Sequence, residues 1–225
     1  TAGLVGHRAF GVPALTFDGA GATNFSGVID GKGSLHKIGS GTLTLSTANT
    51  YEGWTEIYQG VVVATNANAF GLAGSGLVDI QAGAALHLSG GINIAKALAI
   101  REGGIGFGEG TDSSALGALR SISGSNTWSG NIDLAAGNNL IGVNSGSTLN
   151  LSGVISSALS GGNRLIKMGE GTLQITGTEA NVFRGETRVM QGTLELGKTA
   201  GLNAVGGNVV VGTDIEVNGT QTLRL

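Results

Sequence analysis

The chain has 225 residues, of which 43 are glycine, one is proline and none is cysteine, and 12% are charged against 40% hydrophobic. This composition excludes a disordered tail and, because glycine has no period of three, a collagen. The absence of cysteine excludes a disulfide framework and a thiolate metal site. A formal net charge of −3 without a basic stripe argues against nucleic-acid binding.

The chain reads as one continuous domain over residues 1–225. No charge block, proline-rich stretch or shift in composition divides it. The first residues, Thr1–Gly3, show no basic and then apolar signal region. No stretch approaches the roughly 18 apolar residues of a membrane-spanning helix, so we expect no transmembrane segment.

Short runs with an apolar residue at every second position are typical of half-buried strands. Such runs occur at 42–46, 77–80, 85–88 and 193–196. Glycine-rich pieces between them suit tight turns, because glycine readily adopts positive φ. Residues 94–100 are the only helix-like stretch. Their apolar positions fit a strand equally well, and the strands on both sides favour a strand over a helix there.

A longer pattern has three parts: a Gly-Thr-Leu strand start, an Asn-x-aromatic-x-Gly turn, and a glycine that opens the next strand. The first copy consists of Gly41, Thr42, Leu43, Asn49, Tyr51, Gly53 and Gly60. The second consists of Gly171, Thr172, Leu173, Asn181, Phe183, Gly185 and Gly192. Between them, Asn126, Trp128 and Gly130 repeat the turn alone. With their flanking residues the copies cover about 25–60, 115–135 and 150–197.

Repeats built from short strands and turns indicate a stack of coils. An antiparallel sandwich or barrel also uses many short strands. A parallel β-helix explains the matched residues better, because a turn residue then lies above its equivalent on the next coil. We therefore expect a ladder of asparagines and stacked aromatic rings along the turns. Coils with a period of about 18 to about 25 residues, as in short-repeat solenoids, predict about ten of them.

The same phrases resemble the autotransporter-associated β-strand repeat, also called the passenger-associated transport repeat. It occurs in passenger regions of type V secreted proteins of Gram-negative bacteria. The resemblance implies an all-β, right-handed parallel β-helix that is exported through the outer membrane and is displayed on, or released from, the cell surface. It also implies that the chain is a fragment of a larger passenger, whose own C-terminal β-barrel translocator lies outside it. The chain departs from the family pattern at Val61, at Trp54 and at Val182–Phe183, which are tolerable turn and strand substitutions.

No residue pattern predicts a metal, a cofactor or catalysis. His7, His36 and His87 have no acidic or second histidine partner at ligand spacing, which favours exposed strand histidines. Residues 102–112 combine glycines with carboxylates but lack calcium-loop spacing, which favours a projecting loop. Phosphate-loop, dinucleotide and Gly-x-Ser-x-Gly nucleophile motifs are all absent.

The strongest enzyme alternative is a β-helical polysaccharide lyase or hydrolase. It requires two carboxylates about 5 to 10 Å apart, one of them with a raised pKa. The dispersed acids that coiling could bring together are Glu52, Glu56, Asp112, Asp133, Glu170 and Glu179. Among aromatic residues, the three at the shared turn position predict stacking. Trp54 has no equivalent in the other copies and is the candidate exposed contact residue.

The sequence therefore predicts a structural segment without enzymatic activity: a β-helical stalk that supports outer-membrane translocation and surface display. The alternative is an adhesin or self-association module that binds a host-cell or neighbouring-cell surface. A polar, repetitive flank favours the stalk, whereas an apolar or charged strip, or a projecting insertion at 101–118, favours binding.

Overall fold

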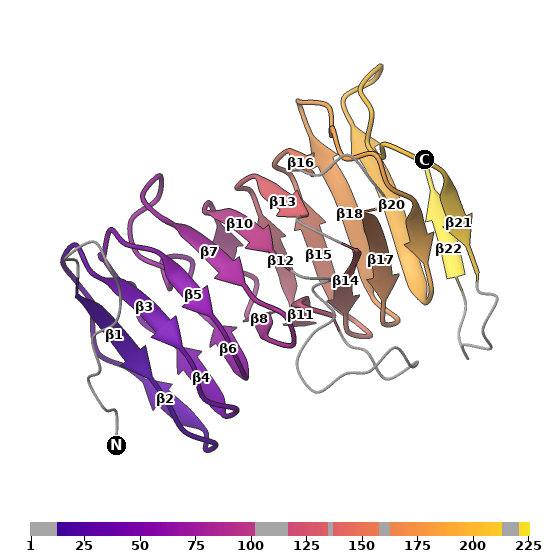
Figure 1. Ribbon diagram of the computed structural model, residues 1–225. Coiled ribbons are helices and arrows are strands. Elements are labelled where there is room, and N and C mark those ends of the chain that lie inside the picture. The colour runs from indigo at the N-terminus through magenta and orange to yellow at the C-terminus, as the bar shows by residue number, and fades with distance from the viewer. Residues whose placement is uncertain (1–12, 102–116, 135–136, 158–162, 213–220) are drawn as a thin grey trace.

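The computed structural model describes residues 13–101, 117–134, 137–157, 163–212 and 221–225. Within these ranges all regular elements are β-strands and no helix is present. All the described strand pairs are parallel, which excludes the antiparallel sandwich. The chain coils into a parallel β-helix, as predicted (Figure 1).

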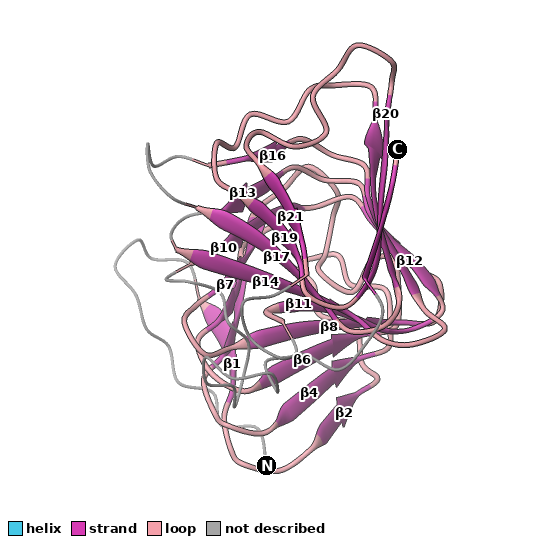
Figure 2. Cartoon of the chain, turned by 90° about the vertical axis from the view of Figure 1, so that its right-hand side faces the viewer, coloured by secondary structure: helices cyan, strands magenta, loops and turns pink. Residues whose placement is uncertain are grey.

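The strands form three sheets, each listed here in spatial order. The first sheet consists of β1 (Ala14–Phe17), β3 (Ser34–Lys37), β5 (Thr55–Ile57), β7 (Leu77–Ile80), β10 (Ala97–Ile100), β13 (Ile132–Leu134) and β16 (Ile155–Ser156). The second consists of β2 (Thr23–Phe25), β4 (Thr42–Leu45), β6 (Val61–Ala64), β8 (Ala85–Ser89), β11 (Leu119–Ser123), β14 (Asn138–Val143), β17 (Arg164–Met168), β19 (Thr187–Val189) and β21 (Val209–Val211). The third consists of β9 (Asn93–Ile94), β12 (Ser125–Trp128), β15 (Thr148–Leu151), β18 (Thr172–Gly177), β20 (Gly192–Lys198) and β22 (Gln221–Arg224). In Figure 2, β12 and β20 of the third sheet lie opposite β7, β10 and β13 of the first.

The length of a coil varies along the chain. Leu35 pairs with Thr55 on the next coil, and most coils have a similar length. The step from Leu98 to its partner Ile132 is much longer, because residues 102–116 are inserted in that coil. These inserted residues, which include the predicted projecting loop, lie outside the described residues. The fold has about eight coils, so the prediction of about ten was too high.

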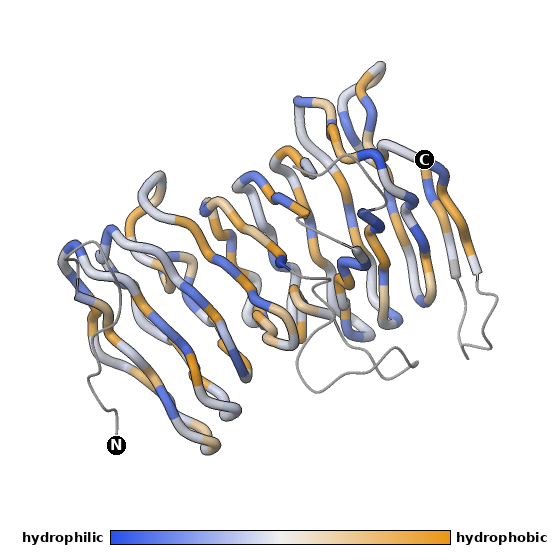
Figure 3. The backbone as a smooth tube through the Cα atoms, viewed as in Figure 1, coloured by the Kyte–Doolittle hydropathy of each residue, from blue (hydrophilic) through white to orange (hydrophobic). Residues whose placement is uncertain are grey.

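Apolar and polar residues alternate along many of the strands, as the tube coloured by hydropathy shows (Figure 3). In strands such as β4 and β15 the apolar residues of this alternation are buried inside the coil and the polar ones are partly exposed. On the second sheet, an interior column runs through consecutive strands, and all its members are fully buried: Leu43, Val62, Leu86 and Leu119. The predicted strand at 94–100 is also present, as the end of β9 and all of β10. The core is therefore a stack of aliphatic layers.

The two full copies of the repeat occupy different sheets. In the first copy, β3 belongs to the first sheet and β4 to the second. In the second copy, the equivalent strands β17 and β18 belong to the second and third sheets. Equivalent turns therefore lie at different corners of the coil, and in coils that are not adjacent. This arrangement decides which contacts the repeated residues make.

Candidate functional site

The asparagine that opens the repeated turn connects three successive coils. Asn49 is buried. Its Oδ1 accepts a hydrogen bond from the Ile29 N–H at 2.8 Å, on the preceding coil, and its Nδ2 donates to the Ala69 carbonyl at 2.6 Å, on the following coil. Both partners are main-chain groups, and each would otherwise be a buried polar group without a partner.

The second full copy repeats this arrangement. Asn181 Oδ1 accepts from the Ile155 N–H at 2.8 Å, and Nδ2 donates to the Ala204 carbonyl at 2.7 Å. The predicted asparagine ladder is wrong, because each side chain bonds the main chain of neighbouring coils and not another asparagine. The repeated turns are too far apart along the stack to contact one another.

In the half copy, Asn126 holds the preceding coil in a related way. Its Oδ1 accepts hydrogen bonds from the N–H groups of Gly91 and Ile92, both at 3.0 Å. Its Nδ2 donates mainly within its own coil, to Ser121 Oγ and to the Ser123 carbonyl, both at 2.8 Å, and at 3.4 Å to the Leu88 carbonyl of the preceding coil. All three turn asparagines thus accept from the coil before them.

The aromatic residue of the turn fills the interior of the coil. Tyr51, Trp128 and Phe183 are all buried. The Trp128 indole N–H donates to the Lys96 carbonyl at 2.7 Å, and the Tyr51 hydroxyl bonds to Thr55. Burial raises the pKa of the Tyr51 phenol.

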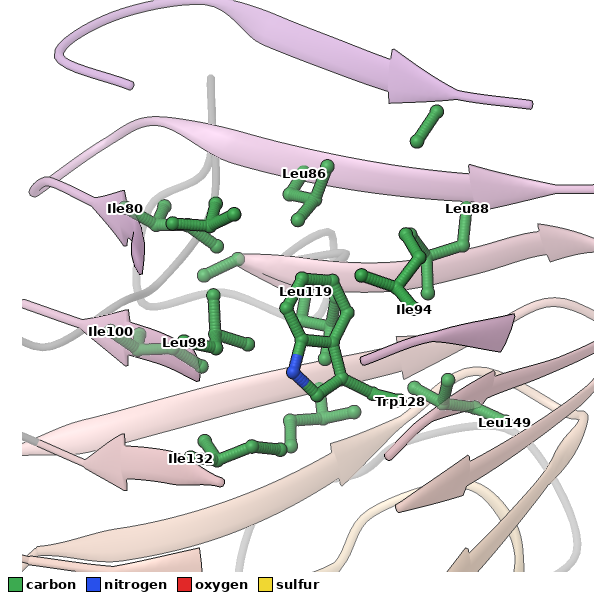
Figure 4. Packing of buried hydrophobic residues seen from close by; sticks show 14 of the residues in the cluster. Ile80, Leu86, Leu88, Ile94, Leu98, Ile100, Leu119, Trp128, Ile132 and Leu149 are labelled. Carbon is green, nitrogen blue, oxygen red and sulfur yellow. The ribbon is translucent and has the colours of Figure 1, made fainter. Parts of the chain in front are cut away.

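Figure 4 shows the Trp128 ring among the aliphatic side chains of several coils, including Leu119 and Ile132. Its aromatic neighbour is Phe70, whose ring centroid is 6.3 Å away at a 43° tilt. The expected stacking of like turn residues on one another is therefore wrong, for the same reason as the ladder: the copies do not lie on adjacent coils.

The glycine that ends the turn is required by the close approach of the preceding coil. A β-carbon at Gly53, Gly130 or Gly185 would lie closer than 3.0 Å to a main-chain carbonyl oxygen of that coil. Real β-carbons do not approach an oxygen so closely, so any side chain would force the coils apart. Gly60 and Gly192 have the same close approach and also a positive φ, of 75° and 68°.

The other repeat positions form the strand that precedes the turn. Thr42, Leu43, Thr172 and Leu173 lie at the starts of β4 and β18, with the leucines buried in the core and the threonines partly exposed. Gly41 and Gly171 precede them, and a β-carbon there would clash with main-chain oxygens of the preceding coil. The predicted repeat residues thus serve coil-to-coil packing.

Two buried lysines occupy equivalent positions in the repeat, and no role was predicted for them from the sequence. Lys37 and Lys167 point inward at the ends of β3 and β17, within aliphatic columns. Lys167 Nζ donates to the carbonyls of Met168 at 2.9 Å, Gly169 at 2.5 Å and Gln191 at 3.1 Å. The signal was present in the sequence, because the two lysines align when the copies are superimposed.

Burial lowers the pKa of Lys167 to about 7, from the 10.5 of an exposed lysine, and the nearby Glu170 opposes this shift. The folded protein therefore releases this proton at a lower pH than the unfolded chain. The stability associated with the neutral amine is complete above pH 10.5, and is lost as the pH falls from 10.5 toward 7.

We expect the free energy of unfolding to rise between pH 7 and pH 9, by up to about 1.4 kcal/mol per pH unit from this group. Denaturant titrations at several pH values would measure it. The matched variant is Lys167→Met, which keeps the length of the side chain and removes the titrating group. An equal slope in both proteins would contradict the assignment to Lys167.

The outer face of the first sheet carries a polar network that sequence spacing did not reveal. His36 Nε2 lies 2.7 Å from Glu56 Oε2, and the Tyr58 hydroxyl donates to Glu56 Oε1 at 2.8 Å. Farther along the sheet, Arg101 Nε contacts the Asp79 carboxylate at 3.1 Å. Burial raises the pKa of Asp79, and the hydrogen bond from Arg101 opposes this rise.

The expectation of exposed histidines was wrong for both described histidines. His36 is buried, and its acidic partner Glu56 is distant in the sequence but directly opposite on the next coil. His87 is partly buried, and burial lowers its pKa to about 4. His7 and Asp112 lie outside the described residues.

The candidate contact residue, Trp54, precedes β5 and is 46% exposed. Of the acids named from the sequence, Glu56 faces Asp79 across β5 and β7. In the described part of the chain, no group of three or more His, Cys, Asp or Glu residues is placed to hold a metal ion. No helix within the described ranges is long and apolar enough to cross a membrane.

Comparison with known proteins shows what this chain is similar to. The sequence model of the passenger-associated-transport-repeat family matches residues 35–64 and 165–196. These two matches overlap the first and last predicted copies, so the resemblance is confirmed. The chain is 34% identical over 205 residues to the adhesin BmaC autotransporter of Brucella suis biovar 1 (strain 1330). The match covers 90% of this chain but 5% of that much longer protein. No solved structure gives a significant match.

Proposed function

We propose that this chain forms a stalk segment that supports outer-membrane translocation and surface display. The reason is that it is a β-helical repeat region of the autotransporter passenger type. The whole of residues 1–225 acts as one continuous β-helical unit of a longer passenger. Its partner in export is the C-terminal translocator of the same protein. The segment is then secreted, or held at the surface of a Gram-negative bacterium.

The observation that carries this proposal is the bridging by Asn49 and Asn181. Each side chain hydrogen bonds to the coil before it and to the coil after it. A coil that has just been exported is therefore stabilised by main-chain and side-chain hydrogen bonds to the neighbouring coil that has already folded. Since stability in a solenoid comes from contacts between neighbouring units, each added coil opposes sliding of the chain back through the membrane.

The proposal is tested by an Asn49→Ala/Asn181→Ala double variant in the full-length parent protein. We expect surface display to fall several-fold, while adhesion per displayed molecule stays unchanged. Display is measured with an antibody on intact cells, against total protein in lysates. The control is Asn24→Ala, which removes an exposed asparagine on β2. Normal display of a double variant whose isolated chain is measurably destabilised would overturn the proposal.

A direct adhesive role is the second candidate, and a specific observation favours it. The matched relative is itself named an adhesin, and the exposed Trp54 gives this chain an outward contact residue. In the display experiment, loss of adhesion per displayed molecule would support this role over the stalk.

We propose no catalytic role. The enzyme alternative needs two carboxylates that are available to a substrate, and Glu56 and Asp79 are the described pair on facing strands. Both oxygens of Glu56 contact protein groups, and Asp79 is held by Arg101. This arrangement suits a fixed surface network better than a general acid and base.

A further inference from the structure

The exposed aromatic side chains of the described residues are concentrated in and beside one strand, β5. Trp54 and Tyr58 are 46% and 38% exposed, whereas the other described aromatic residues are buried or partly buried. Residues 54, 56 and 58 alternate with the inward-facing Thr55 and Ile57, so all three point outward. Trp54 and Tyr58 therefore flank the Glu56 carboxylate on the outer face of the first sheet.

This face is held in place by the neighbouring coil. The Trp54 main chain accepts from the Leu35 N–H at 2.8 Å and donates to Ser34 Oγ at 3.2 Å. The Tyr58 ring meets the His36 ring edge-on, with centroids 5.7 Å apart. The backbone of Trp54, the Tyr58 ring and the Glu56 carboxylate are thus fixed before any ligand arrives, which lowers the entropic cost of binding.

From this arrangement we propose that the outer face around Trp54, Glu56 and Tyr58 binds an uncharged saccharide chain. A sugar ring presents an apolar face of C–H groups that packs on an aromatic ring, and hydroxyl groups at its rim that donate to a carboxylate. Each oxygen of Glu56 uses one lone pair within the protein and keeps another for a ligand hydroxyl. The strand from Trp54 to Tyr58 separates the two aromatic residues by about 13 Å, which favours an oligosaccharide over a single sugar.

The charges on this face argue against the other ligand classes. Arg101 is held by the Asp79 carboxylate at 3.1 Å, so this cation is engaged within the protein and does not recruit an anionic glycan. The same pairing offsets the charge of Asp79, which leaves less negative charge on this face to recruit a cationic peptide. Strand β5 pairs with β3 on one side and β7 on the other, so it has no free edge to which an extended peptide could add.

The site is tested on the isolated chain, residues 1–225, by titration with cellohexaose, maltohexaose and the hexamer of N-acetylglucosamine. The chain has two tryptophans, and Trp128 is fully buried, so a saturable change in tryptophan fluorescence reports Trp54. We expect at least one of these neutral oligosaccharides to give such a change, and heparin and polylysine to give none.

Calorimetric titration of variants then assigns the contact. Trp54→Ala and Tyr58→Ala are expected to weaken binding at least tenfold, as truncation of an aromatic anchor does. Val182→Ala, which alters an exposed apolar residue elsewhere, is expected to bind like the unaltered chain. Melting curves show that each variant is folded.

Absence of binding to all three neutral oligosaccharides, or equal affinity of the Trp54→Ala chain, overturns the proposal. Competition by polylysine would also overturn it, and would point instead to a cationic peptide. This binding site is separate from the stalk function: the titration involves no export, so either proposal can fail while the other stands.

Discussion

Replacement of Trp128 by alanine is expected to lower the free energy of unfolding by about 4 kcal/mol, the largest effect of any single substitution considered for this chain. The side chain is fully buried and is the largest in the core. Its removal leaves a cavity between coils, because main-chain pairing fixes the strands on either side. It also leaves the Lys96 carbonyl without its indole donor.

The effect is measured by denaturant titration, with circular dichroism as the signal. The matched control is Trp54→Ala, which removes the other tryptophan from an exposed position and is expected to change stability by less than about 0.5 kcal/mol. The loss of stability in Trp128→Phe should lie between those of Trp54→Ala and Trp128→Ala, because the phenylalanine ring fills part of the cavity. If Trp54→Ala and Trp128→Ala prove equally stable, the interior placement of Trp128 is wrong.

Replacement of Asn49 by alanine is expected to lower the free energy of unfolding by about 3 kcal/mol. The change removes the acceptor of the Ile29 N–H and the donor to the Ala69 carbonyl together. Each buried main-chain group that loses its partner costs about 1–3 kcal/mol. The loss of stability is expected to be local to the first coils, because each coil of a solenoid is stabilised mainly by contacts with its nearest neighbours.

Hydrogen exchange is the sharpest measurement for this variant. The Ile29 amide should lose its protection in Asn49→Ala, while amides around Asn181, which holds its own neighbouring coils, should keep theirs. The control is again the exposed Asn24→Ala, which should leave the exchange of the Ile29 amide unchanged. Retained protection of the Ile29 amide in Asn49→Ala would show that this asparagine does not connect the coils.

The fold was largely predictable because its signals are local. Alternating runs such as that at Thr42–Leu45 identify strands through the side-chain period of two, and this period holds whichever sheet a strand joins. Repetition of the Asn-x-aromatic-x-Gly turn predicted a coil, and the resemblance to the passenger repeat is confirmed. The packing role of the turn glycines was not predicted: the sequence suggested glycine for positive φ, whereas Gly53, Gly130 and Gly185 leave room for a main-chain carbonyl of the preceding coil.

By itself, then, the sequence determined the strands, the coiling and the positions of the repeated turn. The tertiary structure alone decided which sheets the two copies occupy, and therefore that Asn49 and Asn181 bond the main chain of adjacent coils. It also decided that His36 meets Glu56 and that Lys167 lies inside the core. The physical reason is that these contacts join residues of different coils. Their register depends on the length of every intervening loop, such as the insertion that lengthens the coil after β10.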